Sequence, residues 1–242
     1  MPASVRMGSL YGGRMASVRS STLILALSWM ALPFPAGAAA PVWPDTPLAR
    51  VEALALLQSL NAALLSNDSA TLTLDAWCSG HHLAPAGTKI VADRVKDADK
   101  PATAEIRTAL QVGPGEPVRY RRVRLRCGAL VLSEADNWYV PARLTPAMNE
   151  ALDTTDIAFG RAVQPLHFHR RTLSAALLWS PLPADWDKGG RIAASRARAL
   201  AIPDRLIEHR ALLSTPDGVP FSAVVETYRG DVLAFPPPVF AR

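Results

Sequence analysis

Apolar residues recur at helical spacing in the stretch that follows residue 45. Between Thr46 and Ser66, leucine, alanine and valine fall every three or four positions, which is the period of one face of an α-helix. Thr46 followed by Pro47 offers a capping residue and then a residue suited to the first helical turn. The pattern predicts a helix that ends near Leu65 and Ser66.

The next segment is ambiguous. Residues 67–69 (Asn-Asp-Ser) form a second cluster of residues that favour helix caps, and apolar side chains continue from Ala70 to Cys78. This pattern is compatible with a shorter helix or with an extended segment leading into a sheet. The sequence leaves both open.

Two hairpins are predicted further along the chain. Residues 119–141 contain a strand rich in arginine, a tight turn at Gly128 and a returning strand. Residues 206–228 contain a second pair of apolar strands, joined at Pro216-Asp217-Gly218. An Asp-Gly step between two apolar runs is a strong hairpin signal.

Weaker patterns occupy the remaining segments. Strands are predicted at 89–91 and 166–173, and Thr145-Pro146 starts a helix within 144–152. Residues 93–107 alternate in charge and predict an exposed excursion, and 191–200 predict a short basic helix. Helices at the front, hairpins later and no βαβ alternation indicate an α+β fold with an antiparallel sheet.

The first 39 residues have the composition of a cleaved secretory signal peptide. Arginines precede an apolar run from Thr22 to Phe34, and the small-residue patch 36–40 follows. We expect cleavage after Ala38 or Ala39, because the apolar run is too short to span a bilayer; an anchor that stays attached is the alternative. Residues 40–242 are then one domain with an extended proline-rich tail, periplasmic or secreted, without a stable membrane anchor.

Charge argues against a nucleic-acid partner. The net charge is +5, and three arginines but no acidic residues lie in the first 39 positions, so the remainder carries +2. A charge this small gives no general attraction to nucleic acid, and aromatic residues are not interleaved with the basic run. Nucleotide-binding and hydrolase motifs of the P-loop, dinucleotide and Gly-x-Ser-x-Gly kinds are absent from the sequence. Nothing in it indicates the oligomeric state.

The two cysteines, Cys78 and Cys127, leave two interpretations open. In an exported protein an even pair is compatible with a disulfide. Two separate buried thiols are equally compatible with the sequence. The histidines at 81–82 and at 167 and 169 lack a third ligand at metal-site spacing, so no metal is expected.

Glu226 and Arg122 are the candidate site residues. Glu226 lies in a β-branched run; if its side of the strand is solvated it is a surface residue, and if that side is covered it needs a cationic partner or a raised pKa. Arg122 either belongs to a solvated arginine face or reaches into a cavity to bind a carboxylate. On its strand Arg122 alternates with Tyr120, Arg124 and Arg126.

Four segments in this order resemble chorismate lyases. They are 67–71, 122–141 with its closing Pro141, Phe159-Gly160-Arg161, and 218–226 ending in Glu226. The resemblance implies a roughly six-stranded antiparallel sheet flanked by helices, around a site that eliminates pyruvate from chorismate to leave 4-hydroxybenzoate.

In that resemblance the reaction needs no metal or organic cofactor. Arg122 would hold a carboxylate of a small anionic aromatic ligand, and Glu226 would be the acid that assists elimination. Phe159 and Gly160 would add backbone contacts, and Ala70 would line the site. The alternative is a non-catalytic protein that binds an aromatic carboxylate in the same cavity.

Overall fold

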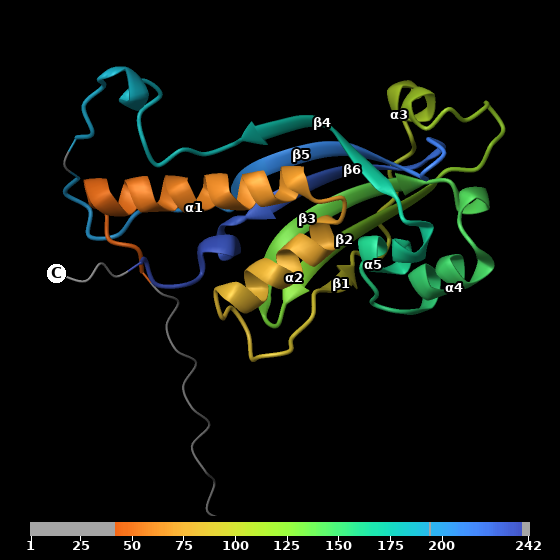
Figure 1. Cartoon of the computed structure of the whole chain (residues 1–242), viewed down its shortest axis with the longest axis horizontal. Helices are drawn as coiled ribbons and strands as arrows, with labels where there is room; N and C mark the ends of the chain where they lie inside the picture. Colours follow the sequence, from red (N-terminus) through yellow and green to blue (C-terminus); the bar gives the residue numbers. More distant parts are fainter. Residues whose placement is uncertain (1–41, 194, 239–242) are drawn as a thin grey trace, which may run out of the picture. The chain divides into compact units, whose positions relative to one another are not determined.

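A six-stranded antiparallel sheet forms the centre of the molecule (Figure 1). The computed structural model describes residues 42–193 and 195–238. Across the sheet the strand order is β1-β2-β3-β6-β5-β4. The strands are β1 (Val91–Arg94), β2 (Arg119–Cys127), β3 (Leu130–Tyr139), β4 (His169–Leu177), β5 (Arg205–Ser214) and β6 (Pro220–Arg229). The α+β class and both hairpins of the sequence prediction are confirmed.

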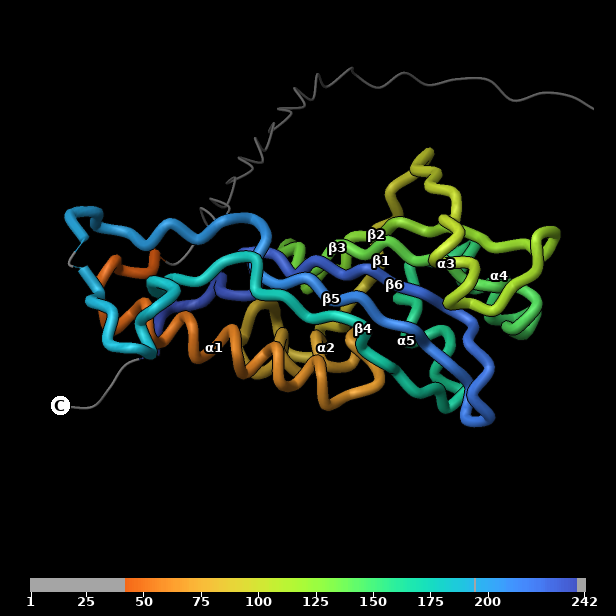
Figure 2. Tube along the Cα trace, turned by 90° about the horizontal axis from the view of Figure 1, so that it is seen from above, coloured from red at the N-terminus to blue at the C-terminus, as the bar shows by residue number. Residues whose placement is uncertain are grey.

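Most helices lie on one side of this sheet. The α-helices are α1 (Pro47–Ser66), α2 (Ala70–Gly80), α3 (Ala104–Ala109), α4 (Pro146–Thr154) and α5 (Phe159–Ala162). Short 3-10 helices occupy Pro141–Arg143, Gln164–Leu166, Trp186–Lys188 and Gly230–Leu233. Figures 1 and 2 show α1, α2 and α5 on one side, which we call the covered face, and α3 on the other, which we call the open face.

Strand pleating distributes the side chains of β2 between these two faces. Successive side chains of a strand point in opposite directions. Arg121, Val123, Leu125 and Cys127 are buried on the covered face. The side chains between them, among them Arg122 and Arg124, lie on the open face. Arg121 and Arg122 are adjacent in sequence, but only Arg121 points toward the helices of the covered face.

Helix α1 begins where the sequence predicts. The Thr46 hydroxyl accepts a hydrogen bond from the Ala49 backbone nitrogen at 3.2 Å, which satisfies one of the free donors of the first turn. By length and composition α1 is apolar enough to cross a membrane. Its apolar side is nevertheless packed into the core, through Ala49, Ala53, Leu54, Leu57, Leu60 and Leu64. It is a core helix of the described domain.

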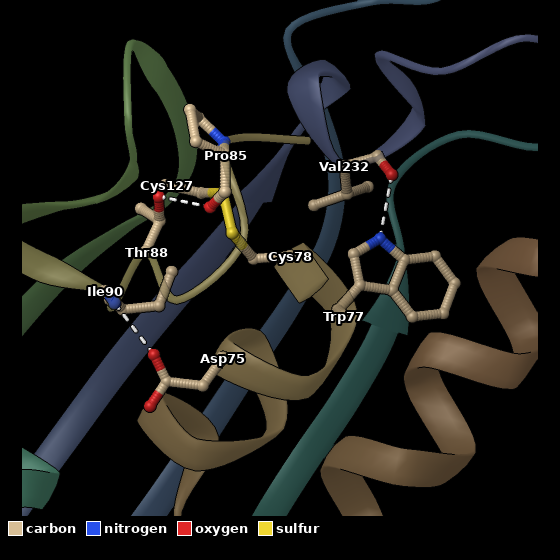
Figure 3. Close-up of a disulfide and its surroundings, with 8 residues drawn as sticks. All are labelled: Asp75, Trp77, Cys78, Pro85, Thr88, Ile90, Cys127 and Val232. Carbon is tan, nitrogen blue, oxygen red and sulfur yellow. Dashed lines mark hydrogen bonds between the residues drawn. A yellow bond between two sulfur atoms is a disulfide. The ribbon is translucent and has the colours of Figure 1, made fainter. Parts of the chain in front are cut away.

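The ambiguous segment after Asn67 is helical, and a disulfide ties its end to the sheet. Ser69 caps α2 by accepting from the Leu72 nitrogen at 3.3 Å. At the other end, Cys78 is bonded to Cys127 at the end of β2, and both side chains are buried (Figure 3). Nearby, the indole nitrogen of Trp77 donates to the Val232 carbonyl at 2.9 Å. The disulfide alternative is the one that forms.

The segment 191–200 contradicts the prediction of a helix. Apart from residue 194, which lies outside the described part, its residues have no helical structure. Ala199 instead bridges to Pro44, and the Leu200 nitrogen donates to the Trp43 carbonyl at 2.8 Å. These bonds to a distant segment hold the chain extended. Likewise the predicted excursion 93–107 contains the end of β1 and most of α3.

The ends of the chain stay outside this description. The predicted signal peptide, residues 1–39, lies among residues that the structure does not describe, as does the end of the proline-rich tail after residue 238. The described part of that tail, residues 236–238, has neither helix nor strand.

Candidate functional site

A small cavity lies on the covered face between the sheet, the start of α2 and the start of α5. Its volume is about 40 Å³, which is room for a water molecule or a small charged group. The polar groups in its lining are Asp68, Ser69, Thr71, Arg121, Asn137, Arg170, Ser222 and Glu226. The apolar groups are Ala70, Val123, Leu125, Ala135, Phe159, Phe168, Leu213 and Val224.

Arg121 is the unusual residue of this lining. Its side chain is buried, with 4% of the residue exposed. Nη2 donates to the Ile157 carbonyl at 3.1 Å, while Nε and Nη1 have no partner within the described part of the chain. Because buried donors are normally satisfied, a buried guanidinium with two free nitrogens indicates a position that receives an anion.

Burial also changes the protonation equilibrium of Arg121. Removal from water, and secondly the nearby charge of Arg94, lower its pKa to about 10, although Tyr139, Asp156 and Asp153 act in the opposite direction. Arg121 is still cationic near neutral pH, because this pKa lies well above 7. The protein therefore keeps a positive charge in a buried position, which costs free energy unless an anion pairs with it.

A buried ion pair occupies the other side of the cavity. Nη2 of Arg170 donates to Glu226 Oε2 at 2.6 Å, and both side chains are less than a tenth exposed. The hydroxyl of Tyr228 donates to the same oxygen at 3.1 Å. Burial works against the charge of Arg170, but the Glu226 carboxylate outweighs it and raises the pKa of Arg170. Of the two alternatives for Glu226, the structure therefore shows the covered residue with a cationic partner and not the surface residue.

The structure separates the two residues that the resemblance brought together. Arg122 lies on the open face, where its Nη2 contacts Glu134 at 3.3 Å and its Nε lies 3.9 Å from Asp136. Its side chain is 45% exposed. Glu226 lies on the covered face, so Arg122 and Glu226 cannot hold one ligand between them. Arg122 reaches a wider cavity of the open face, of about 620 Å³, where the carboxylates of Glu134 and Asp136 are its partners.

Sequence reasoning missed Arg121 and Arg170. Alternation places Arg121 with Val123, Leu125 and Cys127, the apolar side of its strand. An arginine that shares a side with three apolar residues is a signal of a buried charge, and that signal was readable. Arg170 lies in the edge strand β4, where most residues are exposed. The pattern of that strand therefore does not indicate a buried arginine.

Ala70, Phe159 and Gly160 do lie on the cavity wall. Gly160 is needed for close packing there, since a Cβ at this position would be 2.9 Å from Ser69 Oγ and 3.0 Å from Thr71 Oγ1. The first turn of α5 therefore lies directly against the start of α2. A role of these three residues as ligand contacts stays a prediction.

A buried histidine lies behind the ion pair. His209 faces Glu226 across the β5–β6 ladder, and its Nε2 lies 2.8 Å from Asn61 Oδ1. Nδ1 is buried and has no partner among the residues described. Burial lowers the pKa of His209, and Arg170 acts in the same direction against the opposing effect of Glu226. Burial and the neighbouring His82 also lower the pKa of His81.

These two histidines predict that the fold loses stability in mild acid. Below the ordinary histidine pKa of about 6.5 the unfolded chain binds protons that folded His209 and His81 resist, so unfolding becomes easier as pH falls. Each contributes at most about 1.4 kcal/mol per pH unit. Urea unfolding at pH 7 and pH 5 is expected to show a smaller loss in His209→Gln than in the wild type.

The exposed His169 provides the control for this prediction, because His169→Gln removes an imidazole whose side chain is 69% exposed. It is expected to keep the wild-type loss of stability. Equal losses in wild type and His209→Gln would contradict the assignment. In the described part of the chain no group of three or more His, Cys, Asp and Glu side chains is placed to hold a metal.

Comparison with known proteins places the chain in a family. No family model matches it. Over 197 residues it is 62% identical to the "Uncharacterized protein y4mC" of Sinorhizobium fredii (strain NBRC 101917 / NGR234), covering 81% of this chain and 83% of that protein. The chain belongs to the same family as y4mC. Membership at this level of identity assigns the fold to both proteins and leaves the activity to be inferred from the site.

Solved structures share the fold at low sequence identity. PhnF from Mycobacterium smegmatis covers 72% of this chain and 69% of its own, with 16% identity and a TM-score of 0.42. The ligand-binding domain of a putative GntR-family transcriptional regulator from Bordetella bronchiseptica covers 60% of this chain and 85% of its own, with 15% identity and a TM-score of 0.38. At these identities the likeness concerns the arrangement of helices and strands alone.

The expected activity is wrong. The comparisons contradict the expected function, an exported chorismate lyase that releases pyruvate and 4-hydroxybenzoate: the solved structures that this chain resembles include the ligand-binding domain of a putative GntR-family transcriptional regulator. The site agrees with this correction, since Arg122 and Glu226 lie on opposite faces and Glu226 is engaged by Arg170.

Proposed function

We propose that this protein is a ligand-binding domain that holds a small anion in the cavity beside Arg121. The observation that carries the proposal is the buried Arg121 side chain, whose Nε and Nη1 have no partner in the described residues. A guanidinium offers a planar fork of donors that matches the two oxygens of a carboxylate. A bound carboxylate would satisfy these donors and balance the charge at once.

The architecture of the cavity supports binding rather than reaction. Its carboxylate, Glu226, accepts hydrogen bonds from both Arg170 and Tyr228. A carboxylate held in this way is poorly placed to transfer a proton to or from a ligand. Ser222 Oγ donates to Asn137 Oδ1 at 2.6 Å, which fixes a second polar pair in the lining. A pre-ordered set of polar groups in an apolar shell is the usual construction of a small-molecule site.

The volume of about 40 Å³ accommodates the charged end of a ligand. Phe159 and Phe168 lie in the wall, and α5 is only four residues long. A ligand with more carbon atoms would displace these aromatic side chains and the short helix that carries Phe159. We therefore expect the ligand-bound and ligand-free forms to differ at α5 and at the segment before β4.

The experiment is a thermal-shift and calorimetric comparison of matched acids and amides. Butanoate and benzoate are tested against butanamide and benzamide, which have similar shape and no charge. At 100 times its Kd a ligand stabilises the folded protein by about 2.7 kcal/mol, or roughly 5–10 °C in Tm for a domain of this size. We expect the acids to raise Tm and the amides not to. Equal effects of acid and amide, or none from any acid, would exclude the proposal.

We also infer that the protein works in an oxidising compartment after removal of residues 1–39. The bond between the buried Cys78 and Cys127 supports this location, because disulfides persist outside the reducing cytosol. The leader-like composition of the first 39 residues supports it independently. N-terminal sequencing and thiol labelling of protein recovered from cells that express the full chain are expected to find a start at Ala39 or Ala40 and no free thiol. An intact Met1 with two reactive thiols would refute the inference.

A further inference from the structure

The charged groups around the cavity do not contribute equally to its electrostatics. Four charged residues line it, namely Asp68, Arg121, Arg170 and Glu226. Arg170 and Glu226 are in contact at 2.6 Å and cancel each other. Asp68 is at the solvent side, with its side chain 53% exposed. Inside the cavity, the net charge is therefore the single positive charge of Arg121.

We propose that Glu226 sets the charge selectivity of this site. By neutralising Arg170 it leaves one cation for the ligand, so the site accepts a ligand with one negative charge and rejects a ligand with two. The inference rests on the proposed function, and it narrows the ligand class from small anions to monocarboxylates. Phosphate monoesters are disfavoured with the dicarboxylates, because a phosphate group carries about −1.5 to −2 at neutral pH.

The ion pair is too well held to be displaced by a second ligand carboxylate. Glu226 accepts from Arg170 and from Tyr228 at the same oxygen, and the backbone nitrogen of Arg170 donates to Asp68 Oδ1 at 2.7 Å. A second carboxylate on the ligand would have to separate this pair or remain buried without a cation. Both are unfavourable, since burying an unpaired charge in an apolar environment has a high cost.

The position of Glu226 makes its effect on the ligand electrostatic. Arg121 and Glu226 point from the same face of the sheet, and the strand β3 separates β2 from β6. Two strand spacings are about 10 Å, which is too far for Glu226 to compete for the carboxylate held by Arg121. Its effect on the ligand is therefore indirect, through the neutralisation of Arg170.

The remaining wall selects the body of the ligand. Between the two charged positions the lining is apolar, through Val123, Leu125, Phe159, Phe168, Leu213 and Val224. Apolar surface of this kind favours a hydrocarbon or aromatic body over a hydroxylated one. The class that fits the charges and the wall is a small apolar monocarboxylate.

The test compares butanoate with butanedioate, two acids of equal chain length, by calorimetry on the wild type and on Glu226→Gln. We expect the wild type to bind butanoate about 100-fold more tightly, because the second carboxylate of butanedioate would be buried without a cationic partner. The amide side chain of this variant keeps an acceptor for Arg170 and Tyr228 but removes the charge. Butanedioate binding is then expected to improve at least tenfold relative to butanoate binding.

Two further variants keep the test decisive. Glu208→Gln removes a carboxylate from the open face, where Glu208 pairs with Arg205 and Arg210, and is expected to bind as the wild type does. The double variant Arg170→Gln with Glu226→Gln removes both charges of the ion pair together, so it is expected to fold and to keep the butanoate preference. If Glu226→Gln alone fails to fold, the binding of the two acids is compared in this double variant instead.

The outcomes separate this inference from the proposed function. Wild-type protein that binds both acids equally, or a Glu226→Gln variant without any gain for butanedioate, would overturn the charge selection while leaving anion binding in place. A double variant that prefers butanedioate would overturn it too. Wild-type protein that binds neither acid would overturn the proposed function, and this inference with it.

Discussion

Replacing Arg121 by methionine is expected to abolish carboxylate binding and, at the same time, to stabilise the ligand-free protein. Methionine fills a similar volume without charge or donors. The variant lacks the guanidinium and therefore its charged hydrogen bonds to the ligand. Truncating one partner of a buried charge pair costs about 2–5 kcal/mol of binding free energy, or roughly 30-fold to several thousand-fold in Kd. Benzoate titration by calorimetry measures this loss.

The stability gain follows from the same burial. Folded wild-type protein keeps the Arg121 charge out of water with one carbonyl partner and two unpartnered nitrogens in the described structure. Removing an unsatisfied buried donor increases the free energy of unfolding by about 1–3 kcal/mol. Loss of the hydrogen bond to Ile157 lowers it by about 1 kcal/mol. We expect urea unfolding to show a net increase of up to about 2 kcal/mol. A purely structural arginine would show the opposite sign.

Arg122→Met is the matched control, one position along the same strand. Arg122 lies on the open face with its side chain 45% exposed, and surface substitutions usually change stability by less than about 0.5 kcal/mol. Benzoate binding is expected to stay at the wild-type level. Loss of binding in Arg122→Met, or full binding in Arg121→Met, would show that the wrong arginine has been assigned.

Removal of the disulfide is expected to have the second large effect. Cys78 and Cys127 are 49 positions apart, and closing a loop of that length lowers the entropy of the unfolded chain by an amount that corresponds to about 4 kcal/mol. The bond also joins the end of α2 to β2, whose other half carries Arg121. Cys78→Ala with Cys127→Ala is expected to lower the free energy of unfolding by about 2–4 kcal/mol, as measured by urea denaturation.

Reduction of the wild type provides the control. Unfolding in a strong thiol reductant is expected to bring wild-type protein to the stability of the double alanine variant, which itself should not respond to the reductant. A wild type whose urea midpoint is insensitive to reductant would contradict the bond. Unchanged stability in the double variant would contradict its loop-closure effect.

Much of the fold is readable from local patterns. Thr46-Pro47 marks the start of α1, and Asp217-Gly218 marks the turn of the β5–β6 hairpin, because each signal acts through its own backbone conformation. The predicted helix at 191–200 fails for the complementary reason. A short helix is marginal in water, and here the backbone bonds to Trp43 and Pro44, which are distant in sequence, decide the conformation instead.

The candidate site is predictable only in part. Ala70, Phe159, Gly160 and Glu226 were assigned to one site from their segments, and all four line the cavity. Arg122 lies outside this cavity, and its neighbour Arg121 lies in the lining. Arg121 and Arg122 are chemically identical, so residue type cannot distinguish them, and the difference arises from the face on which each lies.

The sequence by itself determined the two hairpins, the starts of α1 and α4, and the alternation that separates Arg121 from Arg122, because these depend on neighbouring residues. Only the tertiary structure decided which side of β2 is covered, that Glu226 meets Arg170, and that Cys78 meets Cys127. Those outcomes depend on packing between segments as far apart as α1, α2, α5 and β4. Burial is a property of that packing, and burial distinguishes Arg121 from the other arginines of its strand.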